Sequence, residues 1–145
     1  MKLAVIDEAL EPWSYLREYQ REAHNQPGEY GATAVFVGTM RDFNEGDEVR
    51  GMFLEHYPGM TERYLEKIAQ QAGVRLSLSV CLIVLRVGHL RPGDPIVLVA
   101  AWSAHRNAAF EACRWLMEEL KSKAPFWKKE QLVEGSRWVE KNTTG

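Results

Sequence analysis

The chain has 145 residues, about the size of one domain, and 46% of them are apolar, which is enough for a sizeable core. Its net charge of −2 provides no overall basic surface for nucleic acid, so any anion site must be a local cluster of cations. No apolar run is long enough to span a bilayer, and the first residues turn acidic too early for a signal peptide. We therefore expect a cytoplasmic protein without membrane contact that forms one domain over residues 1–145.

The two cysteines, Cys81 and Cys113, lie in largely apolar segments without paired spacing, which favours a reducing compartment over a disulfide framework. Neither belongs to a nucleophile motif, and burial would make both inert. The four histidines show no metal-ligand spacing with the cysteines or with one another. The sequence also lacks a glycine-rich phosphate loop and a dinucleotide fingerprint, so it predicts neither a metal site nor a nucleotide cofactor.

The first third of the chain predicts a short strand at residues 3–6 and a helix at residues 12–23, with Pro12 as its first residue. The inner side of this helix is expected to carry Leu16, Tyr19 and Ala23, with Trp13 beside them. Residues 32–40 are rich in apolar and β-branched side chains and predict a buried strand.

The middle of the chain begins with residues 41–48, a polar segment with a glycine that predicts a mobile loop. Residues 51–57 predict another strand. We expect Thr61 to N-cap a helix that reaches about Ala72 and has Gly73 just past its end.

The second half predicts a hairpin of two strands, residues 76–87 and 95–102, joined by a Pro-Gly turn. Ser103 is expected to cap the longest helix, residues 104–123, which the following Ala-Pro ends. Two short strands are predicted near the C-terminus, at residues 127–133 and 136–140. Because strands and helices are interspersed without a strict βαβ rhythm, we predict a mixed α/β (α+β) fold.

Cations lie at both ends of this long helix, in Ser103-Ala-His-Arg106 at its start and in Lys121-Ser-Lys123 at its end. Cations are unfavourable at a helix start, because the N-terminus already carries partial positive charge. A bound anion would remove the conflict and would use the free backbone N–H groups. The sequence thus predicts an anionic ligand near His105 and Arg106.

Several residues at helical spacing share one broad face of this helix: Arg106, Phe110, Cys113, Met117 and Lys121. We predict Phe110, Cys113 and Leu120 to be core residues. Met117 could be core or could line a pocket. Lys121 and Lys123 both suit a helix C-terminus, where cations are favourable, and for Lys121 a role in a site is equally open. A solvated surface position is the alternative for Arg106.

Arg106 and Lys121 are fifteen residues apart. On one straight helix this separates their backbones by about 22 Å, too far to hold the same small anion. A two-fold dimer could bring the helix start of one chain near the helix end of its mate. We therefore expect an active site that is shared between two subunits.

Lys128 and Lys129 follow the helix in a predicted strand, where adjacent side chains point to opposite faces, so at most one of them faces the site. A lysine packed among other cations has a lowered pKa and can act as a nucleophile or general base near neutral pH. Arg41 begins a polar segment directly after a predicted buried strand. This is a common place for a ligand-contacting residue, and an exposed loop arginine is the alternative.

Six segments of the chain keep a specific order and spacing: GATAVFVGTMRDFNEG (31–46), LEHYPGM (54–60), RVGHLRPGD (86–94), SAHR (103–106), AFE (109–111) and KSKAPFWKKE (121–130). Through these segments the chain resembles the large, catalytic subunit of molybdopterin synthase. SAHR followed by KxxAPxWKxE is the most specific part. The resemblance implies a mixed α/β fold of hammerhead type with an additional antiparallel β subdomain.

The resemblance also implies a sulfurtransferase reaction of molybdenum cofactor biosynthesis. The family converts cyclic pyranopterin monophosphate into molybdopterin by inserting two sulfurs as a dithiolene. Sulfur arrives as a thiocarboxylate on the C-terminal glycine of a small ubiquitin-like partner, whose tail enters a pocket of the large subunit. The resemblance implies a heterotetramer around a central homodimer of large subunits, with no metal or cofactor for this step.

The resemblance implies roles for three residues at the end of the long helix or after it. Lys121 is expected beside the thiocarboxylate, and Lys128 beside the pterin as acid or base. Glu130 matches the motif and could orient a lysine.

The motifs also imply residues that bind the substrate. Arg41, His105 and Arg106 are expected to bind its phosphate, the last two from the dimer mate. Phe36 and Met117 match positions that line the pocket.

Two functions of other classes remain as alternatives. A non-catalytic module that binds ubiquitin-like tails would need the tail pocket without both lysines and the phosphate-binding cations. An RNA-binding protein could stack bases on Phe126 and Trp127, but the net charge of −2 argues against it.

Overall fold

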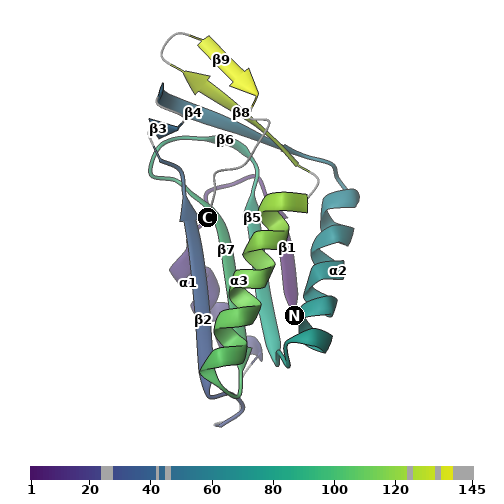
Figure 1. The fold of residues 1–145 in the computed structure, drawn as a ribbon. Coiled ribbons are helices and arrows are strands. Elements are labelled where there is room, and N and C mark those ends of the chain that lie inside the picture. Colours follow the sequence, from purple (N-terminus) through teal and green to yellow (C-terminus); the bar gives the residue numbers. More distant parts are fainter. Residues whose placement is uncertain (24–27, 42, 45–46, 124–125, 133–134, 139–145) are drawn as a thin grey trace.

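The computed structural model describes residues 1–23, 28–41, 43–44, 47–123, 126–132 and 135–138. In these residues, three helices pack on a four-stranded sheet, and a second, antiparallel sheet lies across one end of it (Figure 1). The predicted mixed α/β fold with an additional antiparallel part is confirmed. Within the described part of the chain, no helix has both the length and the apolar character needed to cross a membrane.

The four-stranded sheet has the strand order β1-β5-β7-β2. β1 (Lys2–Ile6) runs parallel to β5 (Val80–Arg86), whereas β5 and β2 (Ala32–Thr39) both run antiparallel to β7 (Pro95–Ser103). The central strands β5 and β7 are almost wholly buried, because helices cover both of their faces. The antiparallel pairing of β5 with β7 confirms the predicted hairpin, although its first strand begins at Val80 rather than at residue 76 and a further short strand, Gly88–Leu90, lies in the connection.

β2 lies at an edge of this sheet, so the prediction of a buried strand is wrong. Val35 and Phe36 are 36% and 39% exposed, although Ala34 beside them is buried. An edge strand has a neighbour on one side only, and its outer margin stays open to solvent unless another element covers it.

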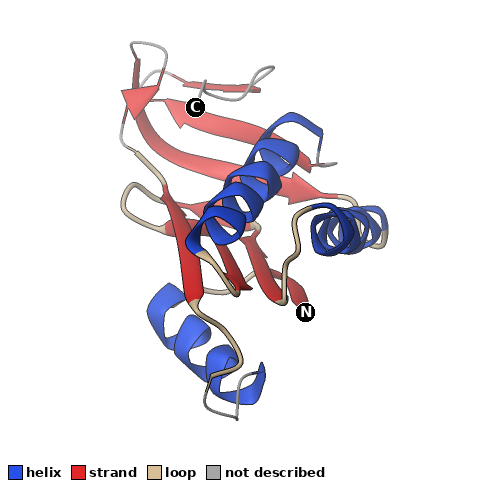
Figure 2. Ribbon diagram, turned by 60° about the horizontal axis from the view of Figure 1, so that its bottom comes forward, coloured by secondary structure: helices blue, strands red, loops and turns tan. Residues whose placement is uncertain are grey.

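The helices enclose the sheet from both sides (Figure 2). α1 (Pro12–Ala23) covers one face, and α2 (Met60–Arg75) and α3 (Arg106–Lys123) cover the other. Alternate residues of β5 and β7 contribute to the two cores, as expected for strands buried on both faces. α1 has its predicted bounds, but Trp13 is 65% exposed rather than packed on the inner side.

The second sheet is built around β4 (Asp47–His56), which pairs with β3 (Phe43–Asn44), β6 (Gly88–Leu90) and β8 (Phe126–Leu132). β9 (Gly135–Trp138) pairs with β8. The sheet lies beside the C-terminal end of α3 (Figure 1). The predicted loop over 41–48 is wrong for residues 43–44 and 47–48, which are strand, while 42, 45 and 46 lie outside the described residues.

Three predicted helix-end residues are wrong. Thr61 lies inside α2, where its Oγ1 accepts the N–H of Tyr57 at 3.2 Å, and Gly73 is a residue of α2. Ser103 is the last residue of β7, paired with Ala32 of β2, and its hydroxyl donates to the carbonyl oxygen of Ser77 at 3.0 Å. Ser103 thus belongs to the β2–β7 ladder and not to the start of the helix, where the sequence pattern placed it.

Candidate functional site

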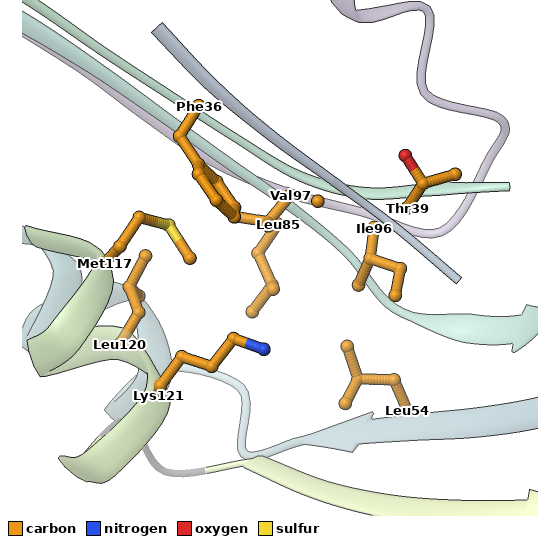
Figure 3. Close-up of a pocket in the computed structure, with 10 residues that line it drawn as sticks. Phe36, Thr39, Leu54, Leu85, Ile96, Val97, Met117, Leu120 and Lys121 are labelled. Carbon is orange, nitrogen blue, oxygen red and sulfur yellow. The ribbon is translucent and has the colours of Figure 1, made fainter. Parts of the chain in front are cut away.

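A small cavity of about 80 Å³ lies where the C-terminal half of α3 meets β2, β7 and β4. Apolar side chains form most of its wall, and Lys121 extends into the space from α3 (Figure 3). The lining residues are Phe36, Gly38, Thr39, Leu54, Leu85, Ile96, Val97, Met117, Leu120 and Lys121. A mostly apolar cavity with one cation can exclude water from a ligand and still neutralise an anionic group on it.

Helical spacing accounts for the part of the wall that α3 contributes. Met117 and Lys121 are four residues apart and share a face of the helix. Met117 is only 8% exposed, so it is both a core residue and a lining residue, the two possibilities that the sequence left open. Cys113 and Leu120 are buried, as predicted.

Phe110 is 66% exposed, and its prediction as a core residue is wrong. Ala109 and Ala112 are buried against the sheet in its place. Successive helical residues are rotated by about 100°, so a one-residue error in the inner face moves a side chain from the core to solvent.

The amine of Lys121 has a pKa below the usual value for lysine. Burial is the main cause, because it disfavours the charged form, and the positive charge of Arg41 acts in the same direction. Glu118 opposes the shift. Such an amine gives up its proton more readily than an exposed lysine, which suits an acid or base in a transfer reaction.

The end of β2 brings Arg41 to this site. Met40 is buried, whereas Arg41, the next residue, is exposed but close enough for its charge to affect Lys121. The pairing of β2 with β7 is irregular here: Gly38 lies opposite Val97 and Thr39 opposite Pro95, so Ile96 is skipped. Bulges of this kind re-aim side chains beside functional sites, and Ile96 lines the cavity.

His105 and Arg106 are not at the cavity of their own chain. Both are exposed, and Arg106 is the first residue of α3, whose other end carries Lys121 (Figure 1). Within one chain, the structure therefore brings together Phe36, Arg41 and the α3 residues of the cavity, and leaves His105 and Arg106 at the opposite end of the helix.

Lys128 and Glu130 lie on β8, at backbone positions opposite Leu54 and Met52 of β4. Lys128 is thus in register with a residue that lines the cavity. The predictions for the side chains of Lys128, Lys129 and Glu130 lie outside what the structure describes.

No cysteine or histidine of the described residues lines the cavity. Cys81 and Cys113 are free and buried, as predicted, and burial raises the pKa of each thiol to about 11. In the described ranges, no three His, Cys, Asp or Glu side chains come close enough to hold a metal ion.

Residues 7–123 match the family described as MoaE protein. The chain belongs to the MoaE family. The match contains β2, α3 and all the cavity-lining residues that the structure describes, and the resemblance noted from the sequence is confirmed.

Other MoaE proteins and their complexes support the assignment. The molybdopterin synthase catalytic subunit of Pseudomonas aeruginosa is 59% identical over 117 residues, which cover 81% of this chain and 78% of that protein. The structure of the molybdopterin biosynthesis MoaE protein from Burkholderia ambifaria MC40-6 has a TM-score of 0.81 and 42% identity, covering 99% of this chain and 92% of that one. A complex of subunits 1 and 2 of the molybdopterin-converting factor from Helicobacter pylori 26695 has a TM-score of 0.80 and 25% identity, covering 97% and 92%.

The cavity is also lined by residues that the sequence analysis missed: Gly38, Thr39, Leu54, Leu85, Ile96 and Val97. Gly38 carried a signal, since an isolated glycine within a strand pattern indicates a bulge or a close approach. A Cβ at Gly38 would lie 2.7 Å from Val97 Cγ1 and 3.2 Å from Phe36 Cε1. The apolar lining residues carried no such signal, because only the packing of separate strands brings them together.

Proposed function

We propose that the cavity beside Lys121 is the place where this chain, an enzyme of molybdenum cofactor biosynthesis, transfers sulfur to cyclic pyranopterin monophosphate. The observation that carries the proposal is the Lys121 amine, which extends into an apolar cavity and has a pKa lowered by burial and by Arg41. The relatives named molybdopterin synthase catalytic subunit supply the reaction.

The sulfur donor in this proposal is the C-terminal thiocarboxylate of a small ubiquitin-like partner. A chain end that finishes in glycine is thin enough to enter a narrow cavity, and the Lys121 amine that lines this cavity suits the thiocarboxylate anion. The two-subunit complex from Helicobacter pylori supports a partner protein of this kind.

The chemistry follows from these placements. The thiocarboxylate sulfur attacks an electrophilic, oxygen-bearing side-chain carbon of the pterin. A carbon–sulfur bond forms as a carbon–oxygen bond of the same carbon breaks, the displaced oxygen takes up a proton, and the partner is linked to the pterin as a thioester. Water then cleaves the thioester, releasing the partner as a carboxylate and leaving the sulfur on the pterin. A second thiocarboxylated partner repeats the transfer. Lys121 stabilises the developing charge and moves protons.

In this proposal the pterin binds at the cavity, with cationic side chains around it. Arg41 binds its phosphate, and Phe36 and Met117 line the approach. Lys128, whose backbone is in register with Leu54, serves as acid or base beside the pterin, and Glu130 orients a lysine.

The direct test is product formation with the purified chain, a thiocarboxylated partner and the pterin precursor. Lys121→Ala should abolish dithiolene formation while the chain stays folded. Lys123→Ala is the matched control, because Lys123 lies two residues away on the same helix but is exposed and paired with Glu119 at 3.1 Å. Full activity of Lys121→Ala would overturn the proposal.

The proposal also includes a site shared between two copies of the chain. The observations in its favour are the edge position of β2, the exposure of Phe36 and Phe110, and the place of His105 and Arg106 at the far end of α3. A two-fold pairing along this margin would cover the exposed aromatic residues and carry the cations of one copy toward the cavity of the other.

Subunit complementation tests the sharing. Arg106→Ala and Lys121→Ala chains should each be inactive alone. If the site is shared, mixing them allows hybrid dimers in which one of the two sites is intact, so random exchange restores about a quarter of the wild-type rate. If each site belongs to one chain, every site of the mixture carries a substitution and no activity returns.

A further inference from the structure

An ion pair that the proposed chemistry does not use joins the last residue of β5 to the end of the segment that leads to β7. Arg86 Nη1 lies 3.8 Å from Asp94 Oδ2, and Arg86 Nη2 donates to the carbonyl oxygen of His89 at 3.0 Å. Asp94 Oδ2 also accepts the backbone N–H of Arg91 at 2.9 Å. The side chains of Arg86 and Asp94 therefore connect the two ends of residues 86–94 with each other and with the backbone between them.

The same segment ends in a tight turn. The N–H of Asp94 donates to the carbonyl oxygen of Arg91 at 2.9 Å, with Pro92 and Gly93 at the two central positions. Gly93 has φ +93°, a conformation that this position of a type II turn requires and that glycine adopts without strain.

This turn holds the backbone immediately before Arg41. The N–H of Gly93 donates to the carbonyl oxygen of Met40 at 2.8 Å, and the N–H of Met40 donates to the carbonyl oxygen of Asp94 at 2.9 Å. Met40 is also buried, so its position is fixed by packing as well as by both backbone groups. The direction in which the chain presents Arg41 thus depends on the turn.

Arg86 is a costly residue to keep for stability alone. Its side chain is 14% exposed, and its Nε is buried without a hydrogen-bond partner in the described part of the chain. A buried donor without a partner destabilises the fold, so an apolar residue would fill this place at less cost.

We propose that Arg86 and Asp94 are positioning residues, which act through the turn and Met40 to hold Arg41 where it meets the substrate. This inference rests on the proposed function, in which Arg41 binds the phosphate of the pterin precursor. Neither Arg86 nor Asp94 touches the reacting atoms. Their effect should therefore appear in the binding of the phosphorylated substrate rather than in the transfer step.

The test is a double-mutant cycle between Asp94 and Arg41, measured by steady-state kinetics with the thiocarboxylated partner. Asp94→Asn removes the charge that faces Arg86 but keeps an oxygen for the N–H of Arg91. It should raise KM for the pterin precursor about tenfold and change kcat by less than about twofold. In an Arg41→Gln background the same substitution should have no further effect, because Asp94 acts through Arg41.

Arg91→Gln is the matched control, since it removes a charge from the same turn and no interaction described in the structure involves the Arg91 side chain. It should leave KM unchanged. Circular dichroism and thermal unfolding check that each variant is folded. If Asp94→Asn does not fold, Arg86→Lys replaces it in the cycle, because a lysine keeps the charge but cannot contact both His89 and Asp94.

The outcomes separate the two proposals. An Asp94→Asn effect that is absent, or that adds in full to Arg41→Gln, overturns the positioning role and leaves the proposed function intact. An Arg41→Gln chain with unchanged KM overturns the phosphate-binding role of Arg41 itself.

Discussion

The two ends of α3 place similar cations in opposite surroundings. At the C-terminal end, Lys121 enters a cavity walled by strands from both sheets, and burial lowers its pKa. At the N-terminal end, His105 and Arg106 are exposed and the helix packs on the sheet through alanines. The comparison teaches that the lowered pKa of Lys121 comes from its surroundings, because cations at the other end of the same helix stay exposed.

The largest effect on stability should come from the packed half of α3. Leu116→Ala removes a side chain that is 0% exposed, and it should lower the free energy of unfolding by about 2–5 kcal/mol. Denaturant unfolding monitored by circular dichroism measures this. A cost below 1 kcal/mol, on the order of a surface substitution, would mean that this half is not packed as described.

The second largest effect on stability is expected from a larger side chain at Gly38, in the wall of the cavity. Gly38→Val places a Cβ 2.7 Å from Val97 Cγ1, so the strand must shift or the cavity must change shape. We expect a loss of about 1–3 kcal/mol in stability and at least about a tenfold loss of product formation. Gly73→Ala is the control, because a Cβ there meets no atom within 4 Å.

The pKa of Lys121 predicts a pH-dependent effect on stability. Because the folded chain disfavours the charged amine, the folded state binds fewer protons at this site than the unfolded state, and Lys121 destabilises the fold at neutral pH. Lys121→Met should therefore raise Tm at neutral pH. The gain should shrink as the pH rises through the lowered pKa and vanish above about 10.4, where the amine is neutral in both states.

Thermal unfolding across this pH range measures the gain. Lys123→Met serves as its control, since Lys123 is exposed and paired with Glu119, and it should give no such gain. A Tm difference between Lys121→Met and the unsubstituted chain that stays constant with pH would contradict the burial of the amine.

The smallest effect on stability is expected at the open half of α3. Phe110→Ser should change the free energy of unfolding of the dilute chain by no more than about 0.5 kcal/mol, because Phe110 is 66% exposed. Analytical ultracentrifugation should show weaker self-association if a second copy covers this residue. A cost comparable to that of Leu116→Ala would remove the distinction between the two halves.

The local pattern of the sequence predicts most of the helices and strands. The errors lie where contacts between residues far apart in the chain determine the structure. The bounds of α1 follow from Pro12 and the apolar spacing. Ser103 was assigned to a helix cap because nothing local reveals that β7 pairs with β2 for one more residue. Phe110 was assigned to the core because its apolar side chain, rather than the small alanines beside it, dominates the pattern.

The residues of the site also fall into those that the sequence predicted and those that it did not. Lys121, Met117 and Phe36 could be named from the motifs, and the structure brings them to one cavity. Leu54 and Ile96 could not be named, because they reach the cavity only through the pairing of β4 with β8 and the bulge between β2 and β7. The contact between Gly93 and Met40 likewise joins residues that are far apart in the chain.

The burial of both cysteines has a consequence for an enzyme that handles sulfur bound to an acyl group. A free thiolate near a thioester would compete as an acceptor and divert the acyl group onto the enzyme. With a pKa of about 11, each thiol of this chain is ionised to roughly one part in ten thousand at neutral pH. Cys81 and Cys113 are also only 1% and 7% exposed, so neither thiol competes for the donor's acyl group.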